Sequence, residues 1–371
     1  MGQFKPFILV SWLILSGGLA CADRPREATW QGKMATTDGI TIVSNPRAPL
    51  YGPGVLALEE NLSIGGAHDT NEYAFARAWY IAVNDNGDIF VMDQGDACVK
   101  AFSKNGTYLR SIGRKGQGPG ELQNPSTIHL TSDGRLIFED FYRGLNIFLQ
   151  DGTFSTFIPT TGFVDILTTP SGQIVAHMNT VKFDKPGKEL RVFDGALKEQ
   201  AVFNFVPDEP RDPQIVRPFA GGFCWALTAG NDLAVSFKGD YEIDILSLDG
   251  RLRRRIRKEF DPVEITPEEI VGIQQRLRGR KADIPAAHAA VQGLATDDEG
   301  RLYVKTYERT ADGRSVYYDV FDKDGRCLVK LPIPEEVRPR VWKSGHMYGL
   351  EEDAEGVQKV KRYRLAWRIK P

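Results

Sequence analysis

The sequence has no excess of charge of one sign and, after its first 22 residues, no long hydrophobic run. Its 47 lysines and arginines are balanced by 49 aspartates and glutamates, which gives a formal net charge of −2. A dedicated nucleic-acid-binding protein needs a net positive footprint to neutralise phosphates, so this balance argues against that class. A membrane-spanning helix needs about 20 apolar residues, and no later segment approaches that length.

Cysteine is scarce as well, with four residues in the whole chain. Cys98, Cys224 and Cys327 are far apart and show no CxxC or other metal-binding spacing, so we predict that they are small buried hydrophobic residues. The sequence also lacks a GxSxG motif and any motif that would activate a cysteine. Nothing in it therefore indicates nucleophilic catalysis.

The sequence does contain the material of a folded core. Hydrophobic residues make up 42% of the chain and aromatic residues 10%, which excludes a disordered or collagen-like protein. The 37 glycines predict many turns. Because a single core rarely grows past roughly 250–300 residues, the length taken alone predicts about two domains.

Residues 1–22 have the pattern of a secretory signal peptide, with Lys5 before an apolar run and small residues at the end. Two cleavage sites compete. An A-x-A site ending at Ala22 would release a soluble protein, whereas the end of a bacterial lipobox would make Cys21 an acylated membrane anchor. We favour lipidation at Cys21 and a location in the periplasm or cell envelope, and we expect a flexible linker over residues 23–38.

A hairpin pattern repeats along the rest of the chain. Each copy has an apolar strand, a polar Gly/Asn/Asp turn and a second strand rich in β-branched and aromatic residues, which is the signal for a β-hairpin. The copies are residues 81–93, 128–140, 166–178, 226–237 and 293–307, with a degraded sixth copy at 341–353.

A second marker follows each of the first five copies, an Asn-Gly or Asp-Gly turn that leads into another strand. Its glycines are Gly106, Gly152, Gly195, Gly250 and Gly325. Each unit is therefore a four-stranded antiparallel sheet, and units of about 40–50 residues are typical of β-propeller blades. The sixth unit has no fourth strand. We expect residues 56–66 to supply it and so close the ring, because closure removes the open edge of a linear array.

The repeats, and above all GRKGQGPGEL at 113–122, resemble the NHL-type, TolB-like six-bladed β-propeller family of exported bacterial proteins. The resemblance covers roughly residues 39–371 and implies one all-β propeller domain with four-stranded blades. It says little about activity, because one fold hosts many functions. A helical insertion at about 264–287 interrupts the period between blades 4 and 5; its Thr-Pro-Glu-Glu start and apolar spacing predict a helix of about 13 residues.

In propellers, the face with the blade-to-blade connections and the second-to-third strand loops, which we call the loop face, is the usual ligand site. We expect ligand-binding residues there or in the central channel, namely Arg77, Arg114, Arg217, Tyr307 and Asp165. The glycines of 113–122 are best explained by a tight crossing between blades, with anion binding by Arg114 as the alternative. The basic run from Arg251 to Lys258 falls on an outermost strand, where we predict a solvated sheet edge.

Three histidines, His68, His177 and His288, are expected on the loop face, and converging imidazoles could bind zinc. The Asp/Asn-rich turns lack the ligand order of calcium loops. Our main hypothesis is a monomeric, non-enzymatic binding protein without a cofactor that recognises a protein, peptide or glycan in the cell envelope, binds no nucleic acid and meets the membrane only through its lipid. The alternative is a lyase or hydrolase with zinc or calcium in the channel.

Overall fold

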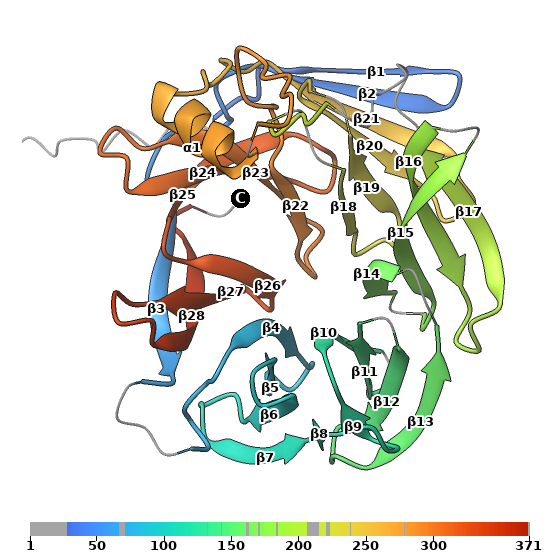
Figure 1. The fold of residues 1–371 in the computed structure, drawn as a ribbon. Coiled ribbons are helices and arrows are strands. Elements are labelled where there is room, and N and C mark those ends of the chain that lie inside the picture. Colours follow the sequence, from blue (N-terminus) through green and yellow to red (C-terminus); the bar gives the residue numbers. More distant parts are fainter. Residues whose placement is uncertain are drawn as a thin grey trace, which may run out of the picture.

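The chain folds into six blades of four antiparallel strands around one axis, and two further strands extend the sheet of one blade (Figure 1). The structure is a computed structural model. It describes residues 28–66, 71–131, 133–141, 143–160, 163–169, 171–182, 185–205, 215–219, 223–237, 239–277 and 279–369. The six-bladed, all-β propeller is confirmed, and one ring of sheets replaces the two domains that the length suggested.

Within each blade the strands follow one another from the axis outward. Blade 1 has β4 (Ala78–Val83), β5 (Ile89–Asp93), β6 (Cys98–Phe102) and β7 (Tyr108–Ile112). Blade 2 has β10 (Pro125–Leu130), β11 (Arg135–Asp140), β12 (Gly144–Leu149) and β13 (Phe154–Pro159), and blade 3 has β14 (Phe163–Thr168), β15 (Ile174–Lys182), β16 (Lys185–Phe193) and β17 (Glu199–Phe205). Blade 4 has β18 (Cys224–Leu227), β19 (Leu233–Ser236), β20 (Glu242–Leu246) and β21 (Leu252–Lys258). Blade 5 has β22 (Gly293–Thr296), β23 (Leu302–Arg309), β24 (Ser315–Phe321) and β25 (Cys327–Pro334). Blade 6 has β26 (Arg338–Lys343), β27 (His346–Glu352), β28 (Gln358–Trp367) and β3 (Leu56–Ile64).

The repeated Asp-Gly turns have a local cause. In the turn between β24 and β25, Asp322 Oδ1 accepts the backbone N–H groups of Asp324 and Arg326 at 3.0 and 2.8 Å. Gly325 has a φ of 87°, and a Cβ there would lie 2.9 Å from Ile256 of the neighbouring blade. The carboxylate thus caps its own turn, and the glycine allows both the left-handed conformation and the contact between blades.

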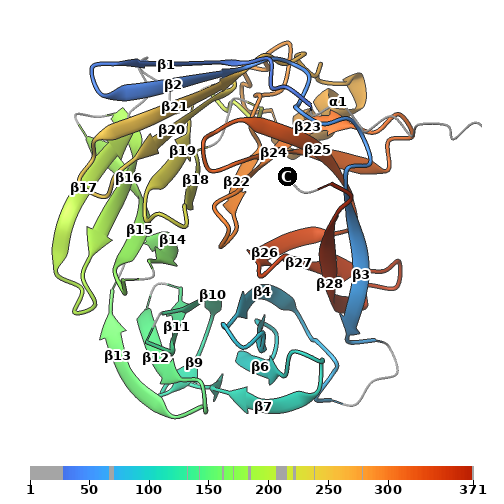
Figure 2. The ribbon, with the colours of Figure 1, turned by 180° about the vertical axis from the view of Figure 1, so that it is seen from behind.

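The N-terminal segment closes the ring as expected. β3 pairs antiparallel with β28 from Val360↔Ile64 to Trp367↔Leu56, so the first and last parts of the propeller share one sheet (Figure 2). Blades 5 and 6 are joined by buried aromatic rings, with Tyr303 stacked on Trp342 at 3.8 Å between ring centroids. Such pairing holds neighbouring blades together by burying apolar area.

Two sequence expectations about blade 4 are wrong. Residues 33–37 of the expected linker form β1 (Lys33–Thr37), which pairs with β2 (Ile40–Asn45). β2 in turn pairs in parallel with β21, so the basic strand is not the edge of its sheet. Acidic side chains on β20 explain why the charges are tolerated: Arg255 bonds both oxygens of Asp244, and Arg257 donates to Glu242 at 2.8 Å.

Asn45 at the end of β2 fastens this hairpin between two blades. It is 3% exposed, its Nδ2 donates to the carbonyl oxygens of Arg257 and Gly325, and its Oδ1 accepts the backbone N–H of Cys327 at 2.7 Å. The sequence offers no signal for these contacts, because each partner is more than 200 positions away.

Replacing Asn45 by alanine should lower the free energy of unfolding by about 2–3 kcal/mol, because it leaves the buried N–H of Cys327 without a partner. Urea denaturation followed by tryptophan fluorescence measures the change. Asn105→Ala, at an exposed turn, is the control and should change stability by no more than about 0.5 kcal/mol. Equal effects of the two substitutions would contradict the role of Asn45.

The insertion between blades 4 and 5 contains α1 (Pro267–Leu277), which has 11 residues. Its N-terminus has the expected capping box: Glu269 N–H donates to Thr266 Oγ1 at 3.2 Å, and Thr266 N–H donates to Glu269 Oε2 at 2.9 Å. No side chain of α1 is fully buried. Within the described parts of the chain, no helix is long and apolar enough to cross a membrane.

Candidate functional site

Irregularities of the innermost strands create the candidate site. The pairing of the first and second strands shifts by one residue near the start of the innermost strand in blades 1, 2, 3 and 6. The extra residue is Trp79 in blade 1, Ser126 in blade 2 and Arg340 in blade 6. Such β-bulges turn a side chain out of the regular alternation, and they do so at the loop-face ends of the strands around the axis.

Four side chains from blades 1 and 6 form what we call the arginine–tryptophan cluster: Arg77, Trp79, Tyr80 and Arg340. The Arg340 guanidinium lies 5.5 Å from the ring centroid of Trp79 and 5.7 Å from that of Tyr80, and the Arg77 guanidinium lies 5.3 Å from that of Trp79. These are cation–π distances. The cluster brings two positive charges together around one indole ring.

The charge of Arg340 is not neutralised by any residue that the structure describes. Its side chain is half-buried, its Nε is buried without a hydrogen-bond partner, and it forms no ion pair within the described segments. Burial, more than any neighbouring charge, lowers the pKa of Arg340. Trp79 next to it remains 36% exposed. The cluster therefore combines an uncompensated cation with an open aromatic surface.

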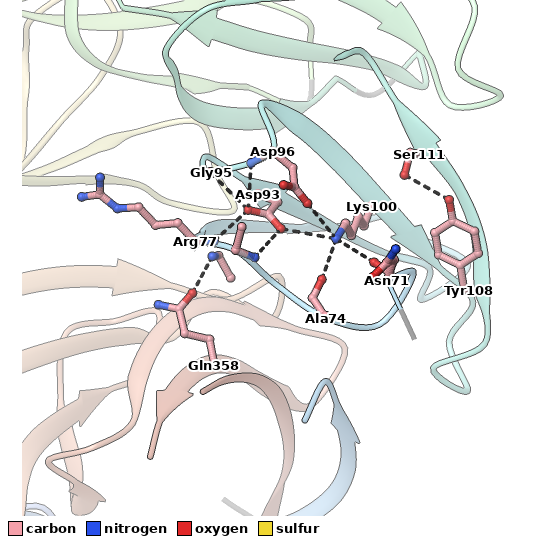
Figure 3. A network of polar contacts seen from close by, with 12 residues as sticks. Asn71, Ala74, Arg77, Asp93, Gly95, Asp96, Lys100, Tyr108, Ser111 and Gln358 are labelled. Atoms are coloured by element: carbon pink, nitrogen blue, oxygen red, sulfur yellow. Dashed lines mark hydrogen bonds and ion pairs between the residues drawn. The ribbon is translucent and has the colours of Figure 1, made fainter. Parts of the chain in front are cut away.

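A polar network around Asp93 and Lys100 holds the backbone that leads into β4 (Figure 3). Asp93, at the end of β5, accepts the backbone N–H groups of Ala76 and Arg77 at 2.9 and 2.8 Å. Lys100 compensates this buried carboxylate from 3.4 Å and also donates to the carbonyl oxygen of Ala74 at 2.5 Å. The connection into blade 1 is thus held at three points before β4 begins.

In blade 2 an aspartate holds the preceding connection in the same way. Asp140, at the end of β11, accepts the backbone N–H groups of Gln123 and Asn124 at 3.1 and 2.6 Å. Arg143 neutralises it at 2.8 Å and also donates to the carbonyl oxygen of Gln117. Both aspartates therefore have structural roles, since their carboxylate oxygens accept backbone N–H groups of the connection that leads into the blade.

Acidic residues approach the cluster from blades 2 and 3. Asp165 on β14 has a buried Oδ1 without a partner, and burial raises the pKa of its carboxyl to about 7, with the Glu139 carboxylate adding to the shift. Burial also raises the pKa of Glu139, which accepts a hydrogen bond from Ser126 Oγ at 2.8 Å. Burial raises the pKa of Tyr80 as well, and Asp165 and Arg340 shift it in opposite directions. Tyr80 therefore lies within electrostatic reach of Arg340 from blade 6 and of Glu139 and Asp165 from blades 2 and 3.

Of the three histidines expected to bind metal, the two in the described residues, His177 and His288, contact different partners. His177 lies on β15, where its ring contacts Phe223, and His288 lies just before blade 5, stacked on Tyr307 at 4.1 Å. Burial lowers the pKa of His177 to about 4 and that of His129, on β10, to about 3, so both are neutral near pH 7. Among the described residues, no group of three or more His, Cys, Asp or Glu side chains could hold a metal ion. His68 lies outside the described residues.

The remaining predicted ligand residues are dispersed. Arg217 forms an ion pair with Asp283 at 2.8 Å, which ties it to the insertion rather than to the axis. Arg114 donates to Glu121 at 2.9 Å, and Glu121 also accepts the backbone N–H groups of Gln117 and Gly118. These bonds lower the pKa of Glu121. The loop at 113–122 therefore binds a carboxylate of its own, because Arg114 and two backbone N–H groups all donate to Glu121.

The described cysteines match their prediction in part. Cys98 and Cys327 are buried, whereas Cys224 is half-buried, and all three are free thiols. Burial raises the pKa of the thiols of Cys98 and Cys224 to about 11, so they remain protonated and unreactive near neutral pH. The anchor predicted at Cys21 lies outside the described residues.

Trp79, Tyr80, Glu139 and Arg340 were missed as site residues from sequence. Their strands are visible as apolar runs, but a one-residue bulge leaves no mark in such a run, and the alternation rule then assigns the wrong side of the strand. Asp165 was predicted as a channel residue from its place on an innermost strand. Arg77 was recognised by its place in the connection before blade 1.

Comparison with known proteins supports the fold. The model of a family described as "6-bladed beta-propeller" matches residues 72–162, which contain blades 1 and 2. A "putative exported protein" from Bacteroides fragilis is similar in structure, with a TM-score of 0.56 and 12% identity over 88% of this chain and 99% of that one. A member of the duf4221 family from Bacteroides vulgatus has a TM-score of 0.55 and 11% identity over 84% of this chain and 98% of that one.

A search of curated proteins finds no match. A streptogramin B lyase is similar at a TM-score of 0.45 and 11% identity, over 84% of this chain and 98% of that one. At such identities the likeness concerns the fold alone. The chain is a six-bladed β-propeller. The finer NHL-type, TolB-like grouping stays a prediction.

Proposed function

We propose that this chain is an exported, lipid-anchored binding protein that holds an acidic glycan at the arginine–tryptophan cluster. The observation that carries the proposal is the uncompensated, half-buried guanidinium of Arg340 beside the exposed ring of Trp79. A guanidinium pairs with a carboxylate or sulfate group through two parallel hydrogen bonds, and burial strengthens such a pair. An exposed indole offers a flat apolar surface against which a sugar ring can pack.

A glycan fits this surface better than a peptide or protein does. The positive charge is confined to two guanidinium groups around one ring, which suits a repeating unit that carries one acid group per sugar. The Asp165 carboxyl and the Tyr80 hydroxyl can exchange hydrogen bonds with sugar hydroxyls, because the carboxyl accepts and the phenolic hydroxyl both donates and accepts. Export is supported by the signal-peptide pattern of residues 1–22, and anchoring by Cys21 rests on the lipobox alternative of the sequence.

Replacing Arg340 by methionine should weaken the binding of tetragalacturonic acid at least about tenfold, since it removes the charged partner of a carboxylate. Isothermal titration calorimetry measures the affinity, and maltotetraose, a neutral tetrasaccharide, should bind weakly to both proteins. Arg114→Met is the matched control, because Arg114 is also on the loop face but is already paired with Glu121.

Unchanged affinity in Arg340→Met would exclude the cluster as the binding site. If the unaltered protein binds an acidic peptide but not the acidic tetrasaccharide, the ligand is a peptide, which the sequence analysis left open, and the glycan proposal is wrong. The metal-dependent alternative has no comparable observation in its favour in the described segments.

A further inference from the structure

A second candidate site lies between the first turn of α1 and blade 5, and none of its lining residues belongs to the arginine–tryptophan cluster. It is a cavity of about 530 Å³, within the range typical of small-molecule sites. One part of its wall is apolar and comes mainly from the loop-face ends of β24 and β25. The apolar lining residues are Val263, Val316, Tyr318, Ile333, Pro334 and Val337.

Lys305 on β23 is the one cation lining this cavity that has no partner in the described parts of the chain. Its side chain is half-buried, and no described residue forms a hydrogen bond or ion pair with its ammonium group. Burial lowers the pKa of Lys305, against the pull of the Glu335 carboxylate. That carboxylate is already held through both oxygens by Arg309, with one contact at 2.7 Å. The Glu335 carboxylate therefore offsets only part of the desolvation cost of the ammonium.

The other charges around the cavity are mostly satisfied within the protein. Glu308 pairs with Lys330, and Glu269 bonds both Thr266 N–H and His288 Nε2, the latter at 3.2 Å. His288 in turn stacks on Tyr307 with an interplanar angle of 9°. Glu264 also lines the cavity, but it is exposed to solvent. The buried part of the cavity thus offers one positive charge beside an apolar wall.

We propose that this cavity binds a small monocarboxylate with an apolar body, such as a medium-chain fatty acid. The carboxylate pairs with the Lys305 ammonium, and the apolar body packs against the wall formed by Val316, Ile333 and Val337. A buried ammonium favours an anion, and a single unpaired cation beside apolar side chains matches one acid group on a hydrocarbon rather than a polyanion. This site is independent of the glycan site, because it uses none of the residues of the arginine–tryptophan cluster.

Calorimetric titration with octanoate at pH 7 tests the proposal. The unaltered protein should bind octanoate, Lys305→Met should weaken binding at least about tenfold, and Lys305→Arg should retain most of the affinity. Octan-1-ol, which lacks the charge, should bind the unaltered protein and Lys305→Met equally. Lys104→Met, at an exposed turn of blade 1, is the matched control and should leave octanoate binding unchanged.

A second measurement needs no substitution at Lys305. Octanoate should protect Lys305 from acetylation by acetic anhydride, with the modified lysines identified by mass spectrometry and exposed Lys115 as the internal reference. Absence of octanoate binding, equal affinity in Lys305→Met, or equal acetylation of Lys305 with and without octanoate would each overturn the proposal. None of these results depends on glycan binding, so the two proposals can fail separately.

Discussion

Replacing Asp319 by alanine should lower the free energy of unfolding by about 3–5 kcal/mol, a large fraction of the stability of a typical domain. Asp319 on β24 of blade 5 lies 3.3 Å from Lys258 on β21 of blade 4, and both side chains are 2% exposed. Tyr241 donates its hydroxyl to the same carboxylate at 2.7 Å. Removing the carboxylate leaves the Lys258 ammonium buried between the blades without a counter-charge.

Two further variants separate the loss of the pair from other effects. The double substitution Asp319→Leu with Lys258→Met should recover most of the lost stability, because an apolar pair can replace a buried ion pair at little cost. Asp261→Ala, which breaks the exposed pair with Arg47, should cost at most about 1 kcal/mol. Urea denaturation measures all three. A double variant as unstable as Asp319→Ala would show that packing, not the unpaired charge, causes the loss.

Replacing Asp165 by asparagine should stabilise the protein at pH 8 by up to about 4 kcal/mol and should have little effect at pH 4. Burial raises the pKa of the Asp165 carboxyl from 3.8 to about 7, and each of these roughly three units corresponds to about 1.4 kcal/mol. The folded state binds the proton more tightly than the unfolded state does. Its stability therefore falls as the pH rises from about 4 to 7, where the folded protein must hold an unfavourable carboxylate.

Other buried groups also change the stability between pH 4 and 8, and the measurement must separate their effect from that of Asp165. The lowered pKa values of His129 and His177 act in the opposite sense, because they cost stability as the pH falls below about 6.5. The unaltered protein and Asp165→Asn both keep these histidines and Glu139, so the difference between their unfolding free energies from pH 4 to 8 isolates Asp165. A difference that does not change with pH would contradict the raised pKa.

The two large effects share one physical origin, the burial of charge within or between blades. Lys258 and Asp319 offset the cost of burial with each other, whereas Asp165 and Arg340 are not offset by any described side chain. A protein retains such uncompensated groups at a cost in stability, and perturbed ionisable groups cluster at functional sites. This reasoning places the candidate binding site at the loop-face end of the channel rather than in the polar networks of the turns.

Local chemistry in the sequence predicted most of the fold. Asp322 and Gly325 specify their turn by bonds and conformations within five residues, and a glycine with positive φ occupies the same turn position in blades 1, 2 and 4. The closing strand was recognisable because Ser63-Ile64-Gly65 repeats Ser111-Ile112-Gly113 of blade 1. These patterns could be recognised because they repeat from blade to blade.

The sequence by itself therefore determined the six-bladed ring, its closure and the helical insertion, all of which depend on local periodicity and turn residues. Only the tertiary structure decided which side chains meet. The β-bulges that bring Trp79 and Arg340 together, the pairing of β2 with the basic strand and the cavity that Lys305 shares with the first turn of α1 join residues from separate blades or connections. Such contacts depend on register and on packing between blades, which leave no local periodicity in the sequence.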